Sequence, residues 1–345
     1  MNFSASTISV VLIYSAMAIY AIALVSYTLD LARRAAPLNR AASLEGTVSA
    51  QNSPSSHASA NGDVVGSSSV TVDVLVATEP PALTVRQSSG SRAGRAAQAL
   101  TVLAWLIHLF GVVLRGVAAH RVPWANMYEF SITSTLIIVG VFLVMQIRLN
   151  IRYLGTFVVG LMLVLLGVGS VGFYVDVVPL PPALQSAWLV IHVLVAMTAT
   201  AFFALSFAVS ALQIAQARPA VSSRPRGTRA RAQLHRLLKT VPSAETLDTM
   251  AYRIIIVGFL LWTFTLMAGA IWANRAWGRY WGWDVKEVWT FIIWVIYAAY
   301  IHAKATRGWN GTRAAWLAIV GFAAVMFNFG VVNVFFKGLH SYSGL

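Results

Sequence analysis

The sequence predicts an all-α, polytopic membrane helix bundle. Of its 345 residues, 58% are apolar and 10% are charged, whereas a soluble domain has about 25% charged residues. Several apolar runs reach the ~20 residues that a helix needs to cross the hydrocarbon core of a bilayer. The Lys and Arg residues lie mainly between these runs, which is typical of membrane proteins.

About eight of these runs predict transmembrane helices. The first is too long for the apolar core of a signal peptide, and its positive charges follow it, so we expect the helix to be retained. The seventh is short and rich in Trp and Tyr, which favours packing against neighbouring helices. The expected spans are 8–29, 97–119, 127–147, 153–173, 187–211, 250–272, 289–304 and 314–336.

The distribution of basic residues predicts the orientation of the bundle. Most of the 25 Lys and Arg residues lie in segments that follow the odd-numbered spans. Because cytoplasmic loops are enriched in these residues, we expect those segments inside and both termini outside. The net charge of +14 could indicate a nucleic-acid partner. Its placement between apolar runs instead favours contact with membrane lipid, and no nucleic acid is expected.

The chain divides into three parts. Residues 1–34 form the first transmembrane helix. Residues 35–96 are expected to be a disordered cytoplasmic linker, because 42–94 are rich in Ser, Ala, Gly and Val and have no helical period. Residues 97–345 form the main membrane domain, whose basic loop 217–244 is read as an anchor on the cytoplasmic side. The absence of Cys excludes thiol redox chemistry and thiolate metal sites.

Aromatic residues gather in one predicted outer loop, at 272–294. An aromatic belt at the membrane surface is one explanation. The other is a flat apolar shelf for a large planar ligand, because Gly278 and Gly282 loosen the segment while Asp284, Lys286 and Glu287 add polar groups beside the rings. Six of the 12 tryptophans lie in this segment: Trp272, Trp277, Trp281, Trp283, Trp289 and Trp294.

This segment resembles the tryptophan-rich signature of a haem-handling family, the WWD domain. The matching residues are Trp277-Gly278, Tyr280-Trp281, Trp283-Asp284, Lys286-Glu287 and Trp289. The resemblance is to the CcsA/ResC branch, and more distantly to CcmC and CcmF. It runs from about residue 97 to the C-terminus, and it includes Pro123, Asn126, Tyr128, Glu129 and the ending Gly338-Leu339-His340-Ser341.

The resemblance implies a membrane subunit of a cytochrome c synthase, a haem lyase complex, in the bacterial plasma membrane. Such a subunit binds haem b, is thought to export it, and presents it on the external side for thioether attachment to the Cys-x-x-Cys-His segment of apocytochrome c. A CcsB/ResB-like membrane subunit is the expected partner. The signature residues named above, Trp277 to Trp289, are the expected haem-contacting residues. No catalytic nucleophile–base pair is evident, so whether this chain is itself an enzyme is left open.

Histidine is a common axial ligand of haem iron. His192 and His340 are both expected at the level of the Trp-rich segment, and the resemblance implies that they are the two external iron ligands. It also implies that His302, near the inner end of the seventh span, binds haem transiently inside the membrane, paired with a histidine of the partner subunit. Without the resemblance, each histidine would be read as a packed polar residue.

Three further ionisable residues lie inside predicted spans: His108, Arg115 and Glu129. A functional role and a structural hydrogen bond fit His108 equally well. Arg115 and Glu129 are expected to pair with each other or with Lys286, and Arg115 or Arg121 could meet a haem propionate. Two other functions remain open, a transporter of another amphiphile and an assembly factor that docks a protein without binding haem.

Overall fold

Residues 4–51, 91–179, 185–217, 238 and 240–340 are described by a computed structural model of the chain, and the side chains of 34–51 and 307 are not described. Within these ranges the protein contains helices and no strands. The helices are α1 (Ala5–Gln51), α2 (Arg92–Ala119), α3 (Met127–Arg148), η1 (Arg152–Leu154), α4 (Gly155–Gly172), α5 (Ala187–Ala217), α7 (Ala244–Trp277), α8 (Val285–Arg307), α9 (Thr312–Phe327), η4 (Asn328–Val332) and α10 (Asn333–Phe335).

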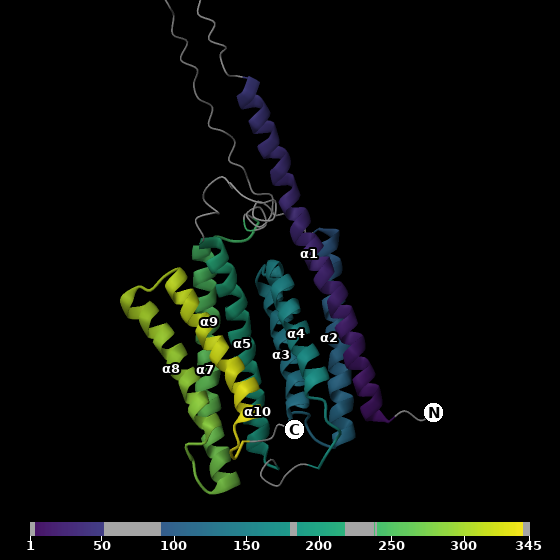
Figure 1. Cartoon of the computed structure of the whole chain (residues 1–345), viewed down its shortest axis with the longest axis vertical. Helices are drawn as coiled ribbons and strands as arrows, with labels where there is room; N and C mark the ends of the chain where they lie inside the picture. The colour runs from purple at the N-terminus through teal and green to yellow at the C-terminus, as the bar shows by residue number, and fades with distance from the viewer. Residues whose placement is uncertain (1–3, 52–90, 180–184, 218–237, 239, 341–345) are drawn as a thin grey trace, which may run out of the picture.

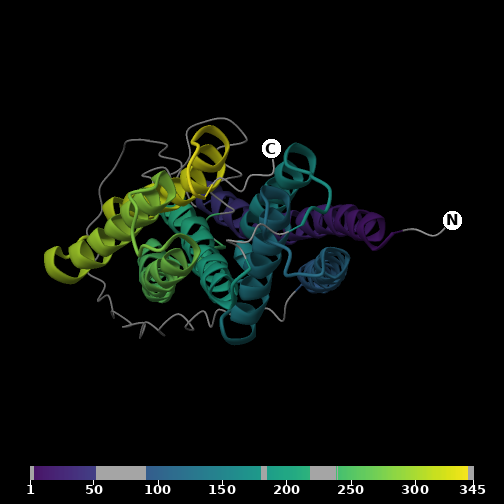
Figure 2. The ribbon, with the colours of Figure 1, turned by 90° about the horizontal axis from the view of Figure 1, so that it is seen from below.

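Eight helical segments of the described chain are long and apolar enough to cross a membrane. The prediction of an all-α, polytopic membrane bundle is therefore confirmed. The helices run side by side, with α1 and α2 at one edge and α8 at the other (Figures 1 and 2). The start of α1, the turn between α7 and α8, and α10 lie at the same end of the bundle (Figure 1). The side of the membrane that this end faces stays a prediction.

The helices pack around α5, which contacts α7, α9 and α3, while α1 packs against α2 and α4. Polar contacts fix α1 at both ends of its membrane span. Ser9 Oγ donates a hydrogen bond to the Gly111 carbonyl over 2.7 Å. The buried Asp30 accepts a hydrogen bond from the hydroxyl of Ser91, the residue that caps α2. The first helix is therefore an integral part of the bundle.

The extent of α1 differs from the first predicted segment. The helix continues to Gln51, beyond the expected boundary at 34, and α2 begins at Arg92 because the Ser91 side chain caps it. Residues 52–90 lie outside the described residues, and so do most residues of the basic loop 217–244. The linker and the anchor remain predictions.

The Trp-rich segment is a loop over only seven residues, 278–284. Gly278 ends α7 in a left-handed conformation with φ +72°. Asp284 then begins α8 with a capping box in which Glu287 takes part. As a result α8 starts at Val285, earlier than the predicted start at 289, and Lys286, Glu287 and Trp289 are helical residues. The expected loop 272–294 is largely helix because these caps lie inside it.

Candidate functional site

A cavity opens between α3, α5, α7, α8 and α9. Its empty volume, including the part open to the surroundings, is ≈ 1690 Å³. Its wall is mainly apolar and aromatic. The lining includes Trp124, Phe130, Ile138, His192, Trp262, Leu266, Trp272, Tyr280, Trp281, Lys286, Phe322, Phe329 and His340.

His192 enters the cavity from the second turn of α5. Its Nδ1 lies 3.0 Å from the Thr265 carbonyl oxygen of α7. Because a carbonyl oxygen accepts hydrogen bonds and cannot donate them, this hydrogen bond requires the proton on Nδ1. The imidazole stacks on Trp272, with centroids 6.0 Å apart and planes 12° from parallel. It also fills the space beside Gly269, where a Cβ would lie 2.7 Å from Cε1 of the histidine. The ring is therefore fixed by α7, and its Nε2 is free to coordinate.

His340 enters the same cavity from the segment after α10. Its Nδ1 lies 2.7 Å from Asp284 Oδ2, and the other oxygen of that carboxylate accepts the Leu339 N–H over 3.0 Å. The hydrogen bond with His340 lowers the pKa of the Asp284 carboxyl below its ordinary value, against the opposing effect of burial. Asp284 orients the imidazole in the manner of an outer-shell carboxylate, so Nε2 is again the available nitrogen.

Trp272 brings the two histidines together. His192 stacks on its indole, while His340 meets the same indole edge-on at 5.4 Å and the Trp277 indole at 4.8 Å. One histidine comes from α5 and the other from the far end of the chain. Two imidazoles with free Nε2 atoms beside one apolar cavity are suited to bind a metal centre that accepts two nitrogen ligands.

The residues of the Trp-rich signature have different places. Tyr280, Trp281, Lys286 and Glu287 line the cavity, whereas Trp277, Gly278, Trp283, Asp284 and Trp289 do not. Trp289 packs against Phe327 of α9 at 4.3 Å. The indoles of Trp281 and Trp283 meet at 89°. The aromatic rings therefore do not form one flat shelf.

Trp283 is the most exposed of these aromatic side chains. Its φ of +59° is rare for a residue with a side chain. Glu287 Oε2 accepts the N–H groups on both sides of it, from Gly282 at 2.7 Å and from Asp284 at 3.1 Å. These two bonds fix the backbone and leave Trp283 77% exposed. Three residues earlier, Tyr280 lines the cavity and is itself 62% exposed, so the cavity reaches the surface there, at its mouth. Glu287 thus shapes the turn as well as lining the cavity.

The structure does not bring His302 and His108 to this site. His302 is exposed near the other end of α8, about 25 Å along the helix from its first residue at 1.5 Å per residue. His108 of α2 is fully buried and lies edge-on to Tyr20 of α1, with ring centroids 6.1 Å apart. Neither residue lines the cavity.

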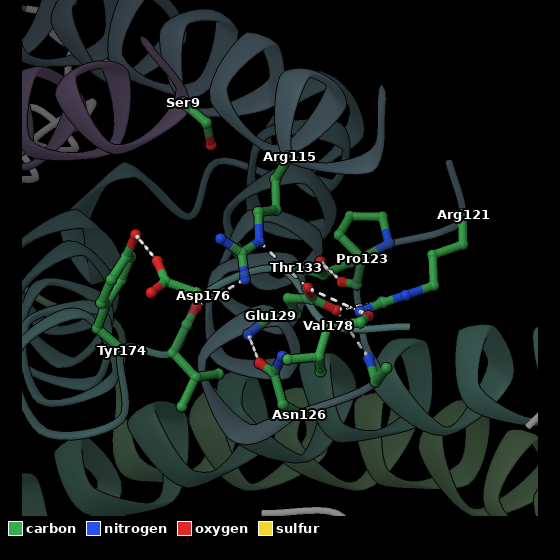
Figure 3. Close-up of polar contacts among 12 residues, drawn as sticks. Ser9, Arg115, Arg121, Pro123, Asn126, Glu129, Thr133, Tyr174, Asp176 and Val178 are labelled. Carbon is green, nitrogen blue, oxygen red and sulfur yellow. Dashed lines mark hydrogen bonds and ion pairs between the residues drawn. The ribbon is translucent and has the colours of Figure 1, made fainter. Parts of the chain in front are cut away.

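Arg115 and Glu129 belong to a buried network next to the site (Figure 3). Glu129 accepts hydrogen bonds from Arg115 Nε at 3.1 Å, from Arg121 Nη1 at 2.5 Å and from the Ala125 N–H at 3.0 Å. Arg115 also donates to the Val175 carbonyl at 2.8 Å. Glu129 therefore pairs with Arg115, one of the two expected partners, and with Arg121. The network holds the segment before α3, whose residues Trp124 to Asn126 line the cavity.

Several residues of the site were not predicted as site residues from the sequence. The sequence indicated Trp272 only as part of an aromatic segment. No sequence pattern pointed to Gly269, because its role depends on the helix packed against it. The cavity wall also contains buried polar atoms without a hydrogen-bond partner among the described residues: Asn126 Nδ2, Ser134 Oγ and Asn328 Oδ1. Polar atoms in an otherwise apolar wall fit a ligand that has polar substituents on an apolar ring.

Known proteins share both the sequence pattern and the fold. Residues 93–340 match the family described as cytochrome C assembly protein. The CcsA cytochrome c biogenesis protein of Guillardia theta is 34% identical over 254 residues, which are 71% of this chain and 84% of that protein. The CcsA of Synechococcus sp. (strain RCC307) is 44% identical over 176 residues, which are 48% of this chain and 57% of that protein.

Among solved structures, the cytochrome c heme lyase CcmF has the same fold, with a TM-score of 0.59 and 14% identity. The match covers 100% of this chain and 51% of CcmF, so the chain corresponds to about half of that protein. At this identity the likeness concerns the fold alone. The family match and the match to the CcsA of Guillardia theta, by contrast, extend over most of the chain. The chain therefore belongs to the cytochrome C assembly protein family, and it is a multi-pass membrane protein of cytochrome c biogenesis.

Proposed function

We propose that this protein is the membrane subunit of a cytochrome c synthase that holds haem b between His192 and His340. The observation that carries the proposal is the placement of these two imidazoles around Trp272, each with Nδ1 occupied and Nε2 free. Haem is the substrate of this site. Two histidine ligands would fix the iron while the apolar cavity wall covers the porphyrin faces.

The residues of the Trp-rich signature have different roles in binding haem and in positioning it. Tyr280 and Trp281 form the wall at the mouth of the cavity, and Lys286 adds a positive charge there that suits a propionate. Asp284 orients His340, and Glu287 fixes the turn that carries Trp283. Trp277 supports His340 and Trp289 anchors α8 on α9. Gly278 supplies the left-handed end of α7.

The thioether bonds need two thiols, and this chain has no Cys. Both thiols would come from the Cys-x-x-Cys-His segment of an apocytochrome c. Each thiol would add across a haem vinyl group. Its S–H bond and the vinyl π bond break, one S–C bond and one C–H bond form, and no group leaves. The contribution of this chain would be to hold the haem in one orientation with its vinyl edge accessible, which is catalysis by positioning.

A CcsB/ResB-like subunit is the proposed partner, and the cavity mouth is proposed to face the external side of the bacterial plasma membrane. His302 lies exposed near the opposite end of α8. A histidine supplied by that partner could complete a second, transient haem site there, from which haem would be exported to the cavity. The exposure of His302 in the isolated chain is compatible with this arrangement.

An absorption spectrum of the detergent-purified protein, alone and with its partner co-expressed, tests the proposal. We expect a haem spectrum of the two-histidine type, lost when His192 and His340 are both changed to Ala. His120→Asn is a matched control, because His120 is exposed near the same end of the bundle, has φ +50° and does not line the cavity. A colourless protein in the presence of the partner would instead favour a docking role without haem.

A further inference from the structure

The two histidines of the cavity are held in very different ways. This difference matters if the proposed function is correct, because a client that brings its own histidine to the iron meets a metal whose two axial positions are filled. One resident histidine must then leave. The exchange is a ligand substitution in which one Fe–N bond breaks and another forms, without any change of oxidation state.

His192 is fixed by rigid structure on several sides. It lies within α5, a helix of 31 residues that packs along α7. The Thr265 carbonyl binds its Nδ1, the backbone at Gly269 lies against its ring, and Trp272 stacks on its face. Moving this imidazole out of the cavity would require α5 and α7 to separate or the first turns of α5 to unwind.

His340 lies in a turn of the irregular segment that follows α10. The helix before it changes from α to π geometry at η4, and regular helix ends at Phe335. Residues Phe336, Lys337 and Gly338 are exposed. The last two described residues of this segment are Leu339 and His340. Both are hydrogen-bonded to the same group, the Asp284 carboxylate. Wide π turns are frequent at functional sites, and here the irregular helix leads directly to the histidine.

The remaining wall does not depend on His340. Trp272 and Trp277 belong to α7, so the indoles that flank His340 stay in place when the segment after α10 moves. His192 and the stacked Trp272 would continue to hold the iron from the other side. The site can therefore lose His340 and keep its ligand, whereas it cannot lose His192 in the same way.

We infer that His340 is the exchangeable iron ligand, which the client's histidine replaces, and that His192 is the permanent one. The inference rests on the proposed function. Asp284 is the positioning residue that sets how readily the exchange occurs, because its carboxylate is the group that holds both Leu339 and His340 in place.

Two glycine variants test the assignment. His340→Gly should keep haem b through gel filtration in a five-coordinate, high-spin form, and added imidazole should restore the low-spin spectrum. His192→Gly should retain no more than about a tenth of the wild-type haem, as expected when an essential ligand is removed. The opposite pattern, or equal loss of haem in both variants, would overturn the inference, while a haem-loaded wild type would keep the proposed function intact.

A second variant keeps both histidines and removes the risk that a glycine variant misfolds. Asp284→Asn retains an N-cap for α8, since Asn and Asp cap helices equally well, but it loses the charge that holds His340. A synthetic peptide with the pattern Ser-x-x-Ser-His can ligate iron and cannot form thioethers. It should replace a resident ligand about 10-fold faster in Asp284→Asn than in the wild type. An unchanged rate of ligand replacement would contradict the assignment of His340 as the exchangeable ligand. A wild type that contains no haem would contradict both the proposed function and this inference.

Discussion

At the residue scale, Gly269 shows how a backbone position can be part of a ligand site. A Cβ there would lie 2.7 Å from Cε1 and 3.0 Å from Nδ1 of His192. In a helix interior, Gly→Ala normally stabilises by roughly 0.5–1 kcal/mol. At this position the methyl group would push the imidazole off Trp272 and away from the Thr265 carbonyl, so the residue is constrained by its neighbour on α5.

We therefore expect Gly269→Ala to lower the haem content of the purified protein while leaving it folded. Gly160→Ala on α4 is the matched control, because the nearest atom to its added Cβ is a Leu24 methyl at 3.5 Å, an ordinary contact. Haem absorbance per protein and the thermal midpoint in detergent measure the two effects separately. Equal haem content in the two variants would show that the close approach to His192 has no influence on binding.

Glu129 is the residue on which the buried network depends. Both it and Arg115 are fully buried, and Arg121 contributes a second positive charge. Breaking a buried ion pair by removing one partner costs about 3–5 kcal/mol, because the other charge is left uncompensated. Glu129→Gln should thus lower the thermal stability of the protein strongly and loosen the segment from Trp124 to Asn126.

The matched control is Glu245→Gln, since Glu245 is exposed in the first turn of α7. It should cost no more than about 1 kcal/mol, the value of a charge near a helix end. Thermal unfolding in detergent compares the two variants. A similar midpoint for both would mean that the Glu129 charge is not what stabilises the network.

At the element scale, helix caps and tertiary packing determine which helix boundaries and contacts the sequence patterns predict correctly. The apolar runs predicted the number of membrane helices because each run is as long as the bilayer is thick. They misplaced the start of α8, where polar residues of the capping box lie outside the apolar run. The π turn at η4 and the contact between Gly269 and His192 depend on tertiary packing, so no local pattern indicated them. The family resemblance implied that His192 and His340 are iron ligands, which stays a prediction, and their shared contact with Trp272 required the fold.

Three helices are joined by a polar cluster at the end of the bundle opposite the cavity mouth. Lys304 of α8 lies 2.5 Å from Asp248 of α7, and Gln213 of α5 donates to the same carboxylate at 2.9 Å. Lys304→Met should lower the thermal midpoint, because it leaves the nearly buried Asp248 without its positive partner. The haem content per folded protein should not change. Lys337→Met, at an exposed position of the segment after α10, is the control for loss of a lysine.

At the scale of the whole molecule, orientation decides whether the site can serve an external client. The turn between α7 and α8, which carries the cavity-lining residues Tyr280 and Trp281, shares one end of the bundle with the start of α1 and with α10 (Figure 1). The positive-inside rule predicts that this end lies outside. The chain has no Cys, so a single introduced cysteine gives a specific label. Trp283→Cys, at an exposed position beside the cavity mouth, should react with a membrane-impermeant maleimide in intact cells. Thr306→Cys, exposed near the opposite end of α8, should react only after permeabilisation. The reverse pattern would place the cavity mouth in the cytoplasm, where it could not present haem to an external apocytochrome.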